Sequence, residues 1–113
     1  PLPRGLTIWA ARAAFGRRPR AVDVELRRAM LDAMSPGPVA ELVPHLLSFD
    51  VRERLGRVEL PTTVIGGTRD VLTPPRTARA IENCIPGATL TLLEGCGHMV
   101  MLERVEELCE ALR

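Results

Sequence analysis

Residues 61–70, with the sequence PTTVIGGTRD, decide the fold of this chain. The run over 62–66 is rich in β-branched residues and free of charge, which predicts a strand buried in a parallel sheet. Residues 88–93, ATLTLL, predict a second strand. A helix between them begins near two prolines and ends at Pro86-Gly87, and an amphipathic helix follows residue 98. The order strand, helix, strand, helix predicts the α/β class.

The first 48 residues have the spacing of helices and contain no predicted strand. We expect helices over 6–15, 21–34 and 39–47, with Pro44 keeping the third short or kinked. In the second helix, the apolar side chains of one face recur every four residues: Val22, Leu26, Met30 and Met34. We therefore predict that 1–48 form a helical cap or lid and that 49–113 form the β-α-β-α part. Trp9, Phe15, Met30 and Met34 either pack within the lid, which we favour, or line a substrate pocket.

The composition excludes several classes of protein. The chain has 113 residues, 46% of them hydrophobic and 26% charged, with a net charge of +1. It fits one small folded unit, and it lacks the basic surface expected of a nucleic-acid partner. There is no apolar run of about 18 residues and no secretory leader, so we expect no transmembrane segment and a cytoplasmic location.

Cysteine and glycine usage argues against a metal or a cofactor. The three cysteines are Cys84, Cys96 and Cys109, and no two of them form a CxxC pair. We expect three buried thiols in a reducing compartment rather than a zinc site. Gly66-Gly67 follows a predicted strand but lacks the spacing of a dinucleotide-binding loop, so no cofactor is expected.

Asp70 and His98 carry the chemical signal of this sequence. Each follows a predicted strand, and two parallel strands joined by a helix end at the same edge of a sheet, where α/β proteins bind ligands. Taken alone, each is more often a turn residue than a catalytic one. Together they form the pair in which an aspartate fixes the tautomer of an imidazole and stabilises its protonated form. His45, the other histidine, is expected to be a surface or packing residue.

These stretches resemble a known family. Residues 61–70 with Thr73-Pro74-Pro75 resemble the acid-bearing strand and loop of α/β-hydrolase-fold enzymes, and residues 85–88 and 93–99 with Leu102-Glu103 resemble their histidine loop and last helix. The resemblance covers roughly residues 49–113. It implies the last two parallel strands of that fold, Asp70 as triad acid, His98 as triad base, and residues 1–48 as part of the variable cap. It also implies a small-molecule ester or acyl compound as substrate.

The nucleophile of such a triad is missing from the sequence. The family order is nucleophile, acid, histidine, yet no G-x-S-x-G elbow precedes Asp70. Ser35 and Ser48 do not lie on a strand-to-helix turn, and Cys96 is too close to His98 along one loop to be aligned with it. We therefore expect the nucleophile upstream, in a missing N-terminal half of the same fold, and Pro1 not to be a natural start.

The identity of that nucleophile separates the remaining alternatives. A serine favours an esterase or lipase-like serine hydrolase, which is our prediction. An aspartate favours epoxide or haloalkane hydrolysis, and cofactor-free haloperoxidation is a further chemistry of the same fold. A non-catalytic, hydrolase-like binding protein is the alternative from another class.

Overall fold

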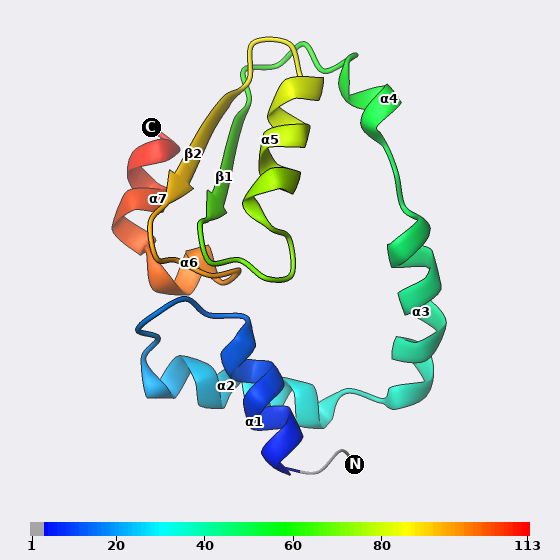
Figure 1. Ribbon diagram of the computed structural model, residues 1–113, viewed down its shortest axis with the longest axis vertical. Helices are drawn as coiled ribbons and strands as arrows, with labels where there is room; N and C mark the ends of the chain where they lie inside the picture. Colours follow the sequence, from blue (N-terminus) through cyan, green and yellow to red (C-terminus); the bar gives the residue numbers. More distant parts are fainter. Residues whose placement is uncertain (1–3) are drawn as a thin grey trace.

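The computed structural model describes residues 4–113 (Figure 1). Within the described residues, four helices precede a β-α-β unit and two helices follow it, which confirms the predicted α/β fold class. In chain order the elements are α1 (Arg4–Ala13), α2 (Ala21–Ala33), α3 (Pro36–Ser48), α4 (Arg52–Leu55), β1 (Thr63–Gly67), α5 (Pro75–Cys84), β2 (Thr89–Leu93), α6 (Val100–Glu103) and α7 (Val105–Ala111).

The two strands form a parallel sheet. β1 pairs with β2 in a register that runs from Thr63 opposite Thr89 to Gly67 opposite Leu93. Helix α5 connects them and packs on both strands. The loops that follow the two strands therefore lie at the same edge of the sheet, as expected, and Figure 1 shows α1, α2 and α6 beyond that edge.

The buried core is small, and most of it lies where the loop between α1 and α2 meets the histidine loop, which follows β2; Ile85 is buried apart from it, at the end of α5. The buried apolar residues are Ala11, Ala14, Phe15, Ile85 and Cys96. The loop between α1 and α2 pairs with the loop after β2 through two backbone hydrogen bonds. The Arg17 amide donates to the Gly95 carbonyl at 3.0 Å, and the His98 amide donates to the Ala14 carbonyl at 2.7 Å. Segments about 80 residues apart in sequence are thus joined directly.

Some local predictions differ from the structure. Helix α3 begins at Pro36, ends at Ser48 and continues through Pro44, although proline lacks the amide that would pair with Ala40. The final helix is two helices, because the backbone of Arg104 is extended away from helical geometry at φ −142° and ψ 56°. The prediction of three buried thiols is wrong, since Cys109 is exposed and Cys84 is half-buried.

The apolar face of α2 is open to solvent. Its side chains are more than half exposed, at Val22 66%, Leu26 55%, Met30 62% and Met34 51%. The prediction of packing within the lid is therefore wrong for Trp9, Met30 and Met34, which are all exposed, whereas Phe15 is buried.

The chain is also more extended than a compact domain. Its radius of gyration is 15.9 Å, whereas a compact domain of this length measures about 13 Å. In Figure 1, α3 stands apart from the sheet. None of the helices in residues 4–113 combines the length and apolar character that a membrane crossing requires.

Candidate active site

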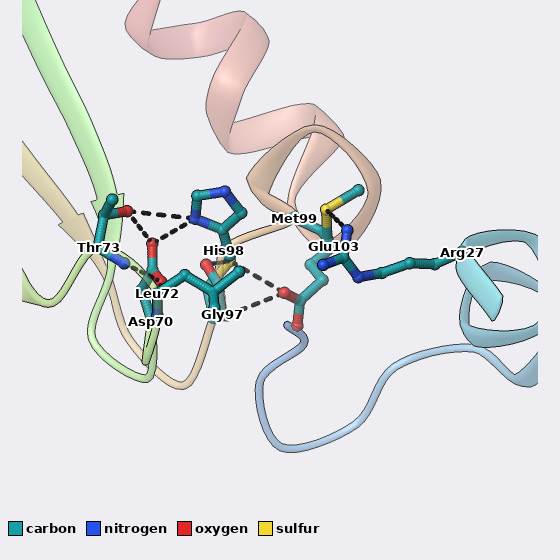
Figure 2. Close-up of polar contacts among 9 residues, drawn as sticks. Arg27, Asp70, Leu72, Thr73, Gly97, His98, Met99 and Glu103 are labelled. Atoms are coloured by element: carbon teal, nitrogen blue, oxygen red, sulfur yellow. Dashed lines mark hydrogen bonds and ion pairs between the residues drawn. The ribbon is translucent and has the colours of Figure 1, made fainter. Parts of the chain in front are cut away.

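The structure brings the two sequence-predicted site residues together. Asp70 lies in the loop after β1, and His98 lies in the loop after β2 (Figure 2). The Nδ1 atom of His98 is 2.9 Å from the Oδ2 atom of Asp70. The Asp70 side chain is 6% exposed and that of His98 is 37% exposed. A buried carboxylate therefore holds one nitrogen of an imidazole that remains accessible.

Asp70 is held as a carboxylate by hydrogen bonds. Its Oδ1 accepts the backbone amides of Leu72 and Thr73, both at 2.9 Å, and its Oδ2 accepts the Thr73 hydroxyl at 2.7 Å. Burial raises the pKa of Asp70, but the donors from Thr73, His98 and Leu72 outweigh it and hold the pKa below the usual value. Since an ionised carboxylate only accepts, Nδ1 of His98 carries the proton and Nε2 carries the free lone pair. In its neutral form, the imidazole therefore presents Nε2 as an acceptor.

Thr73 is a site residue whose role the sequence analysis missed. Its hydroxyl oxygen is 2.7 Å from Oδ2 of Asp70 and 3.2 Å from Nδ1 of His98. The hydroxyl proton goes to the carboxylate, so the oxygen lone pairs face the Nδ1 proton of His98. The available signal was the spacing, because a threonine three residues after an aspartate commonly closes a local side-chain turn.

The position of the histidine loop depends on close contacts between its backbone and the backbones of two neighbouring segments. A Cβ atom on Gly67 would lie 2.3 Å from the carbonyl oxygens of Cys96 and Gly97. A Cβ atom on Gly97 would lie 2.4 Å from the carbonyl carbon of Phe15. Only glycine fits at these two positions. The histidine loop is consequently packed between the end of β1 and the α1–α2 loop, with backbone atoms in direct contact on both sides.

Two charged side chains from other elements reach this loop. Arg27 was not named in the sequence analysis, and Glu103 was named there only within the family resemblance, without a role. The carboxylate of Glu103, at the end of α6, accepts backbone amides from the histidine loop and from the α1–α2 loop. The guanidinium of Arg27, on α2, approaches the Met99 sulfur at 3.9 Å, and its Nε has no hydrogen-bond partner. Figure 2 shows both side chains directed at residues 97–99.

None of the nucleophile candidates within the chain is placed to act. Cys96 is fully buried, and burial, followed by the nearby Glu103 charge, raises the pKa of its thiol to about 11. It is therefore protonated at neutral pH, and a thiol is a poor nucleophile. Ser35 and Ser48 are exposed at the two ends of α3, away from the site. His45, exposed on the same helix, does not take part either.

A cavity of about 350 Å³ adjoins the pair. Asp70, Thr73 and His98 line it on one side, and apolar side chains of β1, α5, α6 and α7 line the rest. Such a space suits an apolar group presented to a small number of polar atoms. Within residues 4–113, no group of three histidine, cysteine or acidic side chains is arranged to hold a metal ion.

Sequence comparison finds hydrolases among the relatives. The chain is 43% identical over 95 residues to the protein named "Putative carbamate hydrolase RutD" of Pseudomonas syringae pv. syringae, covering 84% of this chain and 36% of that protein. It is 35% identical over 69 residues to a proline iminopeptidase of Lactobacillus crispatus, covering 61% of this chain and 23% of that protein. The chain thus spans little more than a third of these curated relatives at most. No protein-family model matches it.

Solved structures match nearly the whole chain. A hydrolase from Pseudomonas aeruginosa PA01 superposes with a TM-score of 0.82 at 27% identity, over 99% of this chain and 43% of that one. A bromoperoxidase from Bacillus anthracis superposes with a TM-score of 0.85 at 19% identity, over 96% of this chain and 42% of that one. The chain has the fold of the C-terminal part of an α/β hydrolase. Because these neighbours bear the names of different chemistries, the function of the chain has to be argued from the site.

Proposed function

We propose that this α/β-hydrolase chain supplies the acid and the base of a serine-hydrolase triad, with Asp70 as acid and His98 as base. The observation that carries the proposal is the 2.9 Å contact between Nδ1 of His98 and Oδ2 of an aspartate held ionised by three further donors. This arrangement leaves Nε2 of His98 free to take a proton. The hydrolase names of the relatives support the same reaction class.

The reaction is acyl transfer to water. A serine hydroxyl from the preceding polypeptide attacks the acyl carbon as its proton moves to Nε2 of His98. Asp70 stabilises the imidazolium, which then gives that proton to the leaving group as the bond to the acyl carbon breaks. Water repeats the sequence on the acyl-enzyme, with Nε2 again taking and returning one proton. The substrate class is a small ester or related acyl compound whose apolar part enters the adjoining cavity.

The partner in this proposal is the nucleophile-bearing part of the same fold, and residues 1–48 serve as its helical cap. The exposed apolar face of α2 and the extended shape of the chain support a further packing partner. Large unpaired apolar faces are costly in water, so a covering surface stabilises them. The coverage of the solved neighbours, less than half of each, agrees with a partner of comparable size.

The test uses the protein that carries this chain together with the nucleophile segment. His98→Ala and Asp70→Asn are each expected to lower turnover of p-nitrophenyl acetate by roughly 10³- to 10⁴-fold, as loss of a triad member or the wrong tautomer does elsewhere. A fluorophosphonate probe labels the wild-type protein, and labelling is lost in His98→Ala. The matched controls are His45→Ala and Asp32→Asn, which change residues exposed far along α3 and α2. Near-normal turnover in either site variant refutes the proposal.

A further inference from the structure

The carboxylate of Glu103 joins two loops that are distant in the sequence. Its Oε1 accepts the backbone amide of Gly97 at 2.9 Å, and its Oε2 accepts the backbone amide of Gly16 at 2.8 Å. The Cys96 sulfur lies 3.8 Å from the same Oε1. Glu103 is six residues from one partner and 87 residues from the other. One side chain therefore ties the histidine loop to the loop between α1 and α2.

Backbone amides, rather than a cationic side chain, stabilise the negative charge of this carboxylate. Glu103 forms no ion pair in the part of the chain that the structure describes. Hydrogen bonds to an ionised acceptor are about twice as strong as those between neutral groups. The two amides have no other acceptor among these contacts, so removing the carboxylate leaves two donors unpaired at a partly buried site.

These bonds act on the residue next to His98. The Gly97 amide is held by Glu103, and the next amide, that of His98 itself, is held by the Ala14 carbonyl at 2.7 Å. The Ala14 anchor depends on the α1–α2 loop keeping its place, which the Gly16 bond to Glu103 secures. The imidazole then has only its side-chain torsions left to define, and the contact with Asp70 defines them.

We infer that Glu103 is a positioning residue, which fixes the backbone that carries His98 and so aims the Nε2 atom of His98 at the nucleophile. The expected loss of kcat rests on the proposed function. The positioning of the His98 backbone rests on the geometry alone. It also gives the α1–α2 loop a role in catalysis that does not require contact with substrate. That loop supplies the Ala14 carbonyl, which accepts the His98 amide, and the Gly16 amide, which binds Glu103.

Glu103→Gln is the decisive change. The amide has the same shape, but its NH2 group cannot accept a hydrogen bond, so one of the two backbone donors loses its partner. A misplacement of about 1 Å in a catalytic group costs on the order of a hundredfold in rate. We expect kcat for p-nitrophenyl acetate to fall by about ten- to a hundredfold while KM changes less than about twofold. Glu106→Gln, an exposed glutamate three residues further on, is the matched control and is expected to keep wild-type kcat.

A spectroscopic readout separates positioning from general stability and from the proposed function. In the protein that carries this chain with its nucleophile segment, the Nδ1 proton of His98 is followed by NMR and assigned by its loss in His98→Gln. We expect its resonance to shift or broaden in Glu103→Gln and to stay unchanged in Glu106→Gln. Glu103→Asp retains the charge but is one methylene shorter, so it keeps one bond and gives an intermediate kcat; it carries the test if Glu103→Gln does not fold.

The outcomes distinguish the two claims. If the wild-type protein turns over substrate and Glu103→Gln and Glu103→Asp leave both kcat and the Nδ1 resonance unchanged, the positioning role is refuted. If the resonance responds as expected but the wild-type protein neither hydrolyses the ester nor reacts with the fluorophosphonate, the proposed function fails and the positioning of His98 by Glu103 stands.

Discussion

Gly16→Ala tests the packing of the α1–α2 loop on the histidine loop. A Cβ atom at this position would lie 1.9 Å from the carbonyl oxygen of Gly95 and 2.9 Å from two backbone carbons of the same loop. Because all three neighbours are backbone atoms, no side chain is available to rotate away. The two loops must separate by about 1 Å or more to relieve the contact.

That separation lengthens two hydrogen bonds past their useful range. One joins the Arg17 amide to the Gly95 carbonyl at 3.0 Å, and the other joins the Gly16 amide to the Glu103 carboxylate at 2.8 Å. A neutral backbone bond contributes about 1 kcal/mol and one to a charged group about 1.5–3 kcal/mol. Gly16→Ala is therefore expected to lower the free energy of unfolding by about 2–4 kcal/mol.

The matched control is Gly5→Ala in the first turn of α1, where a Cβ atom meets nothing within 4 Å. Alanine is a better helix former than glycine, so this change is expected to raise the free energy of unfolding by about 0.5–1 kcal/mol. Urea unfolding followed by far-ultraviolet circular dichroism measures both variants. If Gly16→Ala changes the free energy of unfolding by less than about 0.5 kcal/mol, or stabilises the chain as Gly5→Ala does, the close packing of the two loops is wrong.

Three further predictions concern the site and its surroundings. Thr73→Val removes the hydroxyl that donates to Asp70 and is expected to lower ester turnover about tenfold, since about 1.4 kcal/mol corresponds to that factor; unchanged turnover would contradict it. Because the folded pKa of Asp70 is lowered, its stabilising contribution is complete above the unfolded value of 3.8 and is lost as the pH falls through the folded value. The urea midpoint should thus drop less between about pH 7 and pH 3 in Asp70→Asn than in wild type, and equal drops would refute this. Iodoacetamide at about pH 8 is expected to alkylate exposed Cys109 and spare buried Cys96, whose pKa is about 11, as judged by mass spectrometry; comparable rates at the two cysteines would show that the histidine loop opens.

The parts of this structure that follow from local chemistry were predictable from the sequence. The β-branched run before Gly67 and the proline pair at the start of α5 are short-range signals, and the observed bounds differ from the predicted ones by a residue or two. The meeting of Asp70 and His98 follows from topology, because parallel strands joined by a helix end at one edge.

The parts that depend on contacts distant in the sequence were not predictable in the same way. The period of four in α2 indicated a helix with one apolar face, but it did not show that this face is open in the structure. In the sequence, Glu103 is one polar residue of an amphipathic helix. Its role depends on a contact with Gly16, which lies 87 residues away in the chain.

The bond between Gly16 and Glu103 has a consequence for biosynthesis. During translation Gly16 is synthesised 87 residues before Glu103, whose carboxylate accepts its backbone amide. Until Glu103 emerges, the early loop has no carboxylate to bind, and closing so long a loop carries an entropic cost that grows with its length. Contacts of this separation also slow folding. A ribosome stalled shortly before residue 103 would therefore present a nascent chain in which the histidine loop is translated but is not yet held by Glu103.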